Sequence, residues 1–338
     1  MLKNGTVDET FLDELMAKVR SRSASDLHLV PGCRPMQRID GQLIEAGSFF
    51  ITGDMTERWV KQMLSDEQLG VLQKNKEIDF AGEGIVSGRS RINVFFAGGK
   101  YAVAIRLLSR EVPTCEDLNL PKAVRSLAEL RQGLVLVTGA TGSGKSTTIA
   151  ALLNKINHET GSRIITLEDP IEFVHTSAKS VISQREVGRD TLSFARGLRS
   201  ALREDPDVIM VGELRDYETA AAALTAAETG HLVLTTLHTA DVTTTINRLV
   251  ELRQEYRQQT RMQLAENLQG VICQQLLRRC GGGRIAAFEI LAATEAIRSV
   301  IREGKDHLLS SYIQTGSRYG MITMEQYTDE LRRQGMLE

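Results

Sequence analysis

Several features that mark particular classes of protein are scarce or absent in these 338 residues. The four cysteines are scattered and form no C-x-x-C pair, which argues against a disulfide framework and a cysteine zinc site. No apolar run approaches the roughly 20 residues that a transmembrane helix needs. The net charge is −2, so the overall balance does not indicate binding to nucleic acid or to an anionic membrane surface.

The first residues also lack a targeting signal. Met1–Asp8 contains no hydrophobic core of a secretory signal peptide. We therefore expect a cytoplasmic protein, for which any membrane association would come through a protein partner. Hydrophobic residues make up 42% of the chain and charged residues 25%, which is ordinary for a globular protein, and the length suits two domains.

The most informative stretch that is present runs from Gly139 to Ser146 and has the sequence Gly-Ala-Thr-Gly-Ser-Gly-Lys-Ser. It fits G-x-x-x-x-G-K-[ST], the loop that binds the phosphates of nucleotides. The apolar run Leu134–Thr138 before it is typical of a buried parallel strand, and Thr147–Asn154 after it of a helix. Glycines let backbone N–H groups point at phosphate oxygens, and the helix N-terminus adds positive partial charge.

Two side chains of this loop have distinct expected roles. Lys145 reaches the β- and γ-phosphates, and the Ser146 hydroxyl binds Mg²⁺. The sequence therefore predicts a site for ATP and Mg²⁺. The predicted nucleotide-binding residues are Gly139, Ala140, Thr141, Gly142, Ser143, Gly144, Lys145, Ser146 and Thr147.

Acidic residues follow two further apolar runs. Ile164–Leu167 leads into Glu168 and Glu172, and Val208–Val211 is followed closely by Glu213. An acid after an apolar run is common at the exposed end of any strand. Parallel strands, however, bring their carboxyl ends to one edge of a sheet, where the phosphate-binding loop also lies. There, carboxylates hold Mg²⁺ or orient the attacking water.

Histidines and arginines extend this predicted site. His238 follows the strand His231–Thr236 and is placed to sense phosphate or to pair with a site carboxylate. For His231 a structural hydrogen bond is an equally good interpretation, and neither histidine has the further ligands that zinc needs. Arginines such as Arg106 and Arg203 are usually solvated, but P-loop ATPases often receive an arginine from a neighbouring subunit.

The pattern divides the chain into two domains. The pattern over residues 1–107 predicts a small α+β unit with an antiparallel sheet and one helix over 55–74. Residues 108–118 are predicted to be a linker. Residues 119–338 alternate strand and helix, which predicts an α/β domain with a parallel, doubly wound sheet. After residue 240 we expect a largely helical region, with a strand or hairpin near Arg284–Ile290.

Four ordered motifs carry a resemblance to a known family. The chain resembles the secretion ATPases of type II and type IV secretion and pilus systems, and within them the retraction ATPases of type IV pili. Ala296–Glu303 resembles the C-terminal AIR-containing motif of that branch. The four motifs are the Walker A loop Gly139–Ser146, the Asp box Thr166–Glu172, the Walker B segment Val211–Asp216 and the His box Gly230–Thr239.

The resemblance implies a homo-hexameric motor with a PAS-like N-terminal domain and a RecA-like ATPase domain. ATP hydrolysis would power pilus retraction and twitching motility. The implied partners are an inner-membrane pilus platform protein and, as a further candidate, a second retraction ATPase, with no nucleic acid.

By matching position, the resemblance also implies roles for single residues. Glu213 is the Walker B acid and binds Mg²⁺ with Ser146. Glu172 is the preferred general base, and Glu168 remains its rival. The resemblance also implies that His238 senses the nucleotide and that Arg106 and Arg203 are candidates for phosphate contacts.

The chain departs from the family at several points, and other functions remain open. Ala140 replaces the proline that is usual in this loop. The longer N-terminal region and tetracysteine insert of the assembly branch are missing, which favours a retraction or accessory retraction role. A related secretion or conjugation motor would share the four motifs. A nucleic-acid translocase is disfavoured by the near-neutral charge and the lack of basic aromatic stretches, and a nucleotide-binding scaffold without turnover is a further alternative.

Overall fold

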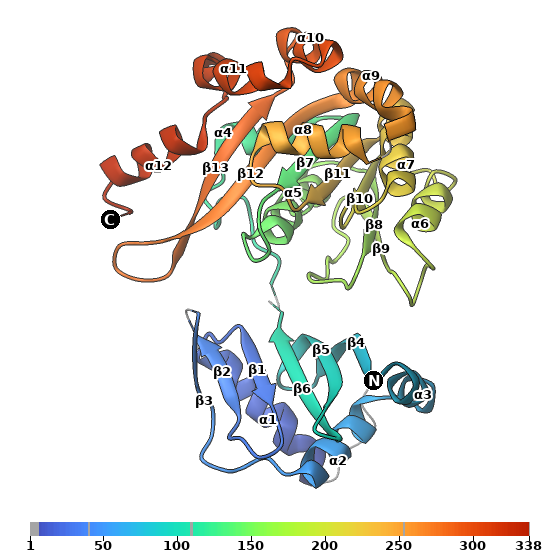
Figure 1. Ribbon diagram of the computed structural model, residues 1–338, viewed down its shortest axis with the longest axis vertical. Helices are drawn as coiled ribbons and strands as arrows, with labels where there is room; N and C mark the ends of the chain where they lie inside the picture. The colour runs from blue at the N-terminus through green and yellow to red at the C-terminus, as the bar shows by residue number, and fades with distance from the viewer. Residues whose placement is uncertain (1–6, 40, 109–110, 253, 338) are drawn as a thin grey trace. The chain divides into compact units, whose positions relative to one another are not determined.

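The computed structural model describes residues 7–39, 41–108, 111–252 and 254–337. They form two compact units, Met1–Glu111 and Val112–Glu338 (Figure 1). The predicted linker over 108–118 stays a prediction, and its residues 109 and 110 lie outside the described residues. No helix in the described part of the chain has the length and apolar character that crossing a bilayer requires.

The first unit is an antiparallel sheet with helices packed against it, as predicted. Its strand order is β3-β2-β1-β6-β5-β4. Side chains from helices and strands, among them Val19, Trp59, Leu27 and Val103, share one apolar core. The strands are β1 (Asp26–Leu29), β2 (Met36–Ile39), β3 (Gln42–Glu45), β4 (Glu77–Gly84), β5 (Gly88–Ala97) and β6 (Lys100–Leu107). The helices are α1 (Val7–Ser21), α2 (Gly53–Met63) and α3 (Asp66–Asn75).

The single helix predicted over 55–74 is wrong, because α2 and α3 are separate. Leu64 adopts an extended conformation and ends α2. Ser65 then begins α3: its side chain accepts from Gln68 N–H, and the Gln68 side chain accepts from Ser65 N–H. This reciprocal pair satisfies backbone donors that a helix start leaves open.

The second unit is built on a seven-stranded sheet in the order β13-β12-β7-β11-β10-β8-β9. All neighbouring strands are parallel except β12 and β13, so the predicted parallel sheet is confirmed. The strands are β7 (Gly133–Thr138), β8 (Arg163–Glu168), β9 (Val181–Glu186), β10 (Val208–Val211), β11 (Leu232–Leu237), β12 (Leu268–Arg278) and β13 (Arg284–Ala292).

Helices cover both faces of this sheet. Along β7, Leu134 and Leu136 pack into one apolar cluster, while Val135 and Val137 pack into another on the opposite face. Burial on both faces explains why the strand is a continuous apolar run. The α-helices are α4 (Lys122–Arg125), α5 (Lys145–Glu159), α6 (Phe194–Ala201), α7 (Tyr217–Glu228), α8 (Val242–Glu251), α9 (Arg257–Asn267), α10 (Glu295–Glu303), α11 (Leu309–Thr315) and α12 (Met324–Arg333).

The expectation of a largely helical region after residue 240 is wrong for β12. This 11-residue strand lies parallel to β7, with Cys273 opposite Thr138. Its apolar run Val271–Cys273 is buried, and periodicity cannot distinguish such a run from a buried helix. The pairing places Gln274 beside the start of the phosphate-binding loop.

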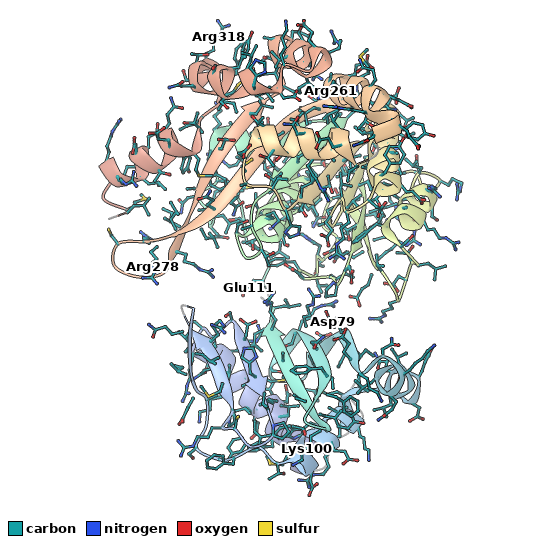
Figure 2. All side chains as sticks on the ribbon, in the orientation of Figure 1. Asp79, Lys100, Glu111, Arg261, Arg278 and Arg318 are labelled. Atoms are coloured by element: carbon teal, nitrogen blue, oxygen red, sulfur yellow. The ribbon has the colours of Figure 1, made fainter. Side chains whose placement is uncertain are left out.

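The C-terminal helices are held by a buried ion pair. Arg261 on α9 donates to both carboxylate oxygens of Asp306 at 2.7 and 2.8 Å, and also to the carbonyl of Ile301 at 2.8 Å. Both charged residues are 5% exposed, and Arg261 lies between the helices at the top of Figure 2. This bidentate ion pair between Arg261 and Asp306 joins α9 to the end of α10.

The arginine of the AIR-containing motif has a structural partner. Arg298 donates to the carbonyls of Ala265 and Glu266 at 2.9 and 2.6 Å. Those carbonyls lie in the last turn of α9, where a helix has no acceptor partners of its own. Arg298 therefore caps α9, while Ile297 and Ile301 of the same motif are buried in the core.

We expect Asp306→Ala to destabilise the second unit by about 3–5 kcal/mol, because the Arg261 cation stays buried without its partner. Arg261→Met combined with Asp306→Leu should recover most of that loss. Urea unfolding of the full chain, followed by the midpoint of the second unit, measures both. The control is Arg332→Met, which removes an exposed pair with Asp329 and should change stability by less than about 1 kcal/mol. A midpoint for Asp306→Ala equal to that of the control would contradict the prediction.

Candidate nucleotide-binding site

The phosphate-binding loop lies at the carboxyl end of β7, as predicted. Gly139 and Gly144 have φ values of +144° and +89°, and Gly144 caps the start of α5. A Cβ on Gly139 would collide with the carbonyl oxygen of Gln274, and one on Gly144 would lie 2.7 Å from Gln274 Nε2. Both positions therefore require glycine for conformation and for space.

Lys145 is the buried cation of the site. It is 7% exposed, and its Nζ donates to the carbonyls of Gly139 and Ala140 at 2.8 and 3.0 Å. Burial lowers the pKa of this ammonium, and the carboxylates of Glu213 and Glu172 oppose that effect. A phosphate in the loop would offer Lys145 a charged acceptor in place of two neutral carbonyls.

His238 links Lys145 to Glu213. Lys145 Nζ lies 3.5 Å from His238 Nδ1, and His238 Nε2 lies 3.3 Å from Glu213 Oε2. The tautomer with its proton on Nε2 satisfies both contacts. The other oxygen of Glu213 pairs with Arg215 at 2.5 Å. Strands β7, β10 and β11 thus bring the side chains of Glu213 and His238 to Lys145, which lies 68 and 93 residues before them.

The two acids of the Asp box have different environments. Glu168 is 8% exposed at the end of β8, and burial raises the pKa of its carboxyl. It accepts from the Thr166 hydroxyl at 2.7 Å, from the Gln184 amide at 3.0 Å and from the backbone N–H of Glu172. Glu172 is half-buried, and its charge acts on Lys145.

Glu168 is therefore the anchor of the segment that carries Glu172. Gln184 adds a second tie, since its amide also donates to the Phe173 carbonyl at 2.8 Å and accepts from His175 N–H at 2.8 Å. Although burial raises the pKa of the Glu168 carboxyl, its donors occupy oxygen lone pairs that an attacking water would need. Of the two acids, Glu172 is the one whose charge acts on Lys145 of the phosphate-binding loop.

Of the two predicted arginines, Arg203 lies outside this cluster of Lys145, His238 and Glu213. Arg203 follows α6 and leads into the amino end of β10, whereas the site lies at the carboxyl ends of the strands. Arg106 belongs to the first unit, where its guanidinium pairs with Asp26 at 3.1 Å.

The remaining histidine has a structural role. His231 Nδ1 lies 2.9 Å from the carbonyl of Ala226 and 3.2 Å from the Thr229 hydroxyl. It closes the last turn of α7, which is one of the two interpretations that the sequence left open.

The donor set suits a nucleotide with its magnesium ion. The Ser143 hydroxyl is buried in the loop with no hydrogen-bond partner among the described residues, which leaves an unused polar group in the cradle. No group of three or more His, Cys, Asp or Glu in the described chain is arranged to hold a metal by itself. Mg²⁺ bound with phosphates needs only one or two protein ligands, and Ser146 and Glu213 are candidates.

Two residues of the site were not predicted. Gln184 and Gln274 are glutamines on strands, a position without a charge or motif to mark it. Gln274 was missed with β12 itself. The signal that was available is its place after the apolar run Val271–Cys273, at the point where a neighbouring parallel strand would end.

The chain is similar to known proteins over its whole length. A sequence model of the family described as type II/IV secretion system protein matches residues 100–332. The type IV pilus retraction ATPase PilT of Pseudomonas aeruginosa is 44% identical, over 96% of this chain and 95% of that protein. A crystal structure of the pilus retraction motor PilT with bound ADP has a TM-score of 0.88 at 43% identity, covering 99% of this chain and 95% of that one. The ATPase DotB of Legionella pneumophila has a TM-score of 0.84 at 29% identity, covering 100% and 96%.

We expect Glu172→Gln to lower the rate of ATP hydrolysis at saturating ATP by about 100-fold or more, the usual contribution of a general base. The matched variant Glu168→Gln should stay within about tenfold, because an amide oxygen still accepts hydrogen bonds in that position. Steady-state phosphate release by the two purified variants measures this. A larger loss in Glu168→Gln than in Glu172→Gln would reverse the assignment.

Proposed function

Because the chain belongs to the type II/IV secretion system protein family, we propose that it is a hexameric ATPase that powers retraction of type IV pili. The observation that carries this proposal is the similarity, across nearly the full length of both chains, to a pilus retraction ATPase. The enzyme is a P-loop ATPase with a RecA-like domain. Its output is extraction of pilin subunits from the fibre, which drives twitching motility.

The roles of the chain's own residues follow from their positions. The loop Gly139–Thr147 binds the phosphates, and Lys145 neutralises charge on the transferred phosphoryl group. Mg²⁺, when bound through Ser146 and Glu213, supplies further neutralisation of phosphate charge. His238 contacts both Lys145 and Glu213, so it is suited to report the occupancy of the site to the rest of β11.

Glu172 takes the proton of the attacking water, and Glu168 positions Glu172. The buried carboxylate of Glu168 ties the backbone of Glu172 to the end of β8. This hydrogen bond keeps the Glu172 side chain close enough to the loop for its charge to act on the pKa of Lys145. Correct placement of a base contributes as much as its chemical strength.

A second subunit completes the site in this proposal. Arg203 lies away from the cluster of Lys145, His238 and Glu213, and Arg106 belongs to the first unit, where it is 56% exposed in its side chain. In a ring, an arginine from a neighbour can stabilise the transition state in trans, as in other P-loop ATPases. Arg106 and Arg203 remain the candidates for phosphate contacts, and the homo-hexamer is the assembly that brings such a neighbour close.

The partners follow from the same proposal. The motor acts on an inner-membrane pilus platform protein, with a second retraction ATPase as an additional partner, and it has no nucleic-acid substrate. Contact with proteins at the cytoplasmic side of the inner membrane is what places it there in this proposal.

A related secretion motor is the second candidate, because the similarity to DotB also spans the whole chain. The identity to DotB is lower than that to the pilus retraction motor, which favours retraction. Both candidates hydrolyse ATP, so only the cellular machine distinguishes them.

We expect Lys145→Ala and Glu213→Ala each to reduce ATP hydrolysis by about 100-fold or more, because each removes charge stabilisation or metal binding at the reacting phosphate. Phosphate release with ATP and Mg²⁺, compared with the wild type, measures this. Equal, near-zero rates in all three proteins would instead indicate a scaffold, and strong stimulation of the wild type by DNA would indicate a translocase.

Deletion of the gene in the host tests the cellular role. We expect more surface pili than in the parent strain and loss of twitching, because fibres extend but are not withdrawn. Electron microscopy of pili and a surface-spreading assay measure the two results. Complementation with Lys145→Ala should fail to restore twitching. Bald cells would contradict retraction and favour assembly or another machine.

A further inference from the structure

The glutamine beside the phosphate-binding loop has an unusual set of contacts. Gln274 lies on β12 and is 3% exposed. Its Nε2 donates to the carbonyl of Ser143 at 2.8 Å, and its Oε1 accepts from the Thr148 hydroxyl at 2.7 Å. Ser143 belongs to the loop, and Thr148 lies in the first turn of α5. One side chain from a different strand thus bridges the loop to the helix that follows it.

The same residue forms a wall of the loop at two further points. The Gly139 Cα lies against the Gln274 carbonyl, and the Gly144 Cα against its amide nitrogen, each too close for a Cβ. These glycines are the first and the last of the motif. Gln274 therefore contacts the loop at its beginning and its end.

Only an amide fits both partners of the Gln274 side chain. The Ser143 carbonyl can only accept, and the Thr148 hydroxyl has a proton to donate, so the bridge needs one donor and one acceptor. A carboxylate would face the Ser143 carbonyl with a second acceptor, and an apolar side chain would leave both buried groups unpaired. An unpaired buried group is costly, and the loop would move to satisfy it.

We propose that Gln274 is a positioning residue for nucleotide binding, which holds the Ser143–Gly144 part of the loop so that its N–H groups point at the phosphates. This rests on nucleotide binding by the loop and goes beyond the roles given to the loop itself. The residue acts through the loop and does not touch the nucleotide. Because β12 is the neighbour of β7 on the side away from β11, it supports the loop where Glu213 and His238 do not reach.

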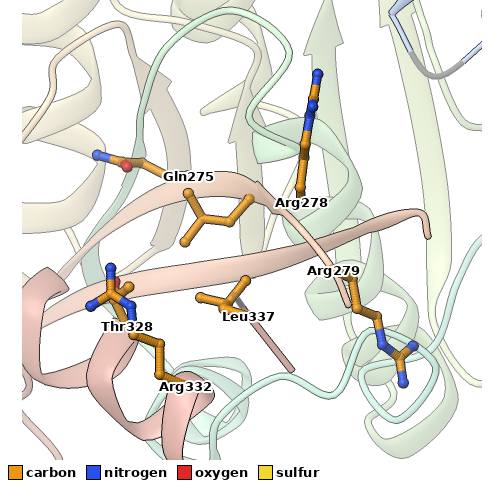
Figure 3. A pocket seen from close by; sticks show the side chains of 7 residues that line it. Gln275, Arg278, Arg279, Thr328, Arg332 and Leu337 are labelled. Atoms are coloured by element: carbon orange, nitrogen blue, oxygen red, sulfur yellow. The ribbon is translucent and has the colours of Figure 1, made fainter. Parts of the chain in front are cut away.

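The next residue on the strand provides a matched control. Gln275 is exposed and lines a separate pocket of about 430 Å³ with Arg278, Thr328 and Arg332 (Figure 3). That pocket contains no residue of the phosphate-binding loop among those that line it. Gln275→Leu therefore makes the same chemical change on the same strand without altering the contacts of the loop.

The test compares Gln274→Leu with Gln275→Leu in the full-length protein. We expect Gln274→Leu to weaken binding of a fluorescent ADP analogue about tenfold, which corresponds to about 1.4 kcal/mol. Its KM for ATP should rise by a similar factor with kcat within about threefold, the sign of lost uniform binding. Gln275→Leu should match the wild type in both measurements.

The outcomes separate positioning from packing. A residue that only stabilises the core would lower the unfolding temperature and leave the affinity of the folded protein unchanged. Binding by Gln274→Leu within twofold of the wild type therefore overturns the proposal. A wild type that binds no ADP analogue overturns the proposed function itself, which is a different result.

A second variant covers the case in which Gln274→Leu does not fold. Thr148→Val is nearly isosteric and removes only the bond to Gln274 Oε1. We expect it to weaken binding about threefold, and the double variant with Gln274→Leu, where it folds, to bind no more weakly than Gln274→Leu by itself, because both act on one bridge. Unchanged affinity in Thr148→Val would overturn the proposal in that case.

Discussion

The ammonium of Lys145 is a cation held away from water, and the surrounding structure supplies what water no longer provides. Two carbonyls of its own loop accept hydrogen bonds from it, and His238 lies next to it. The negative charges of Glu213 and Glu172 oppose the lowering of its pKa by burial. A buried charge is tolerated only with such partners. These partners come from the ends of four strands or from the segments that follow them. The parallel sheet is therefore the condition on which the site depends, because it brings those ends to one edge.

The acids around this cation divide their work by environment. Glu213 faces His238 and Arg215, so its charge stays in the cluster with Lys145. The Glu168 carboxylate accepts hydrogen bonds from three internal donors. These bonds hold the chain segment that carries Glu172. Gln274 acts in the same way on the other side of the loop, where its side-chain amide is hydrogen-bonded to the Ser143 carbonyl and the Thr148 hydroxyl. Glu168 and Gln274, which hold the neighbouring segment and the loop, are thus about as buried as Lys145 itself.

The C-terminal region uses its characteristic residues in two ways. Within the AIR-containing motif, Arg298 caps α9 and Ile297 and Ile301 fill the core. What this motif offers to a partner is therefore restricted to its exposed side chains, such as Arg302 and Glu303. A motif that marks a branch of the family is, for much of its length, a packing requirement. The placement of α10 is also fixed by the buried pair Arg261–Asp306.

Local chemistry explains what the sequence by itself determined. The glycines and Lys145 of the loop, the apolar run of β7 and the acids after β8 and β10 each follow from short-range requirements of phosphate binding and strand burial, and they were predictable. The strand β12 and the break at Ser65 were not, because a buried apolar run has no periodicity of its own and a helix cap is a single residue. Only the tertiary structure decided that Glu168 is buried among internal donors while the charge of Glu172 acts on Lys145, and that Gln274 bonds to the loop. Those roles depend on which strands are neighbours: Gln274 is 131 positions from Ser143 and 126 from Thr148, and they become partners only when the sheet forms.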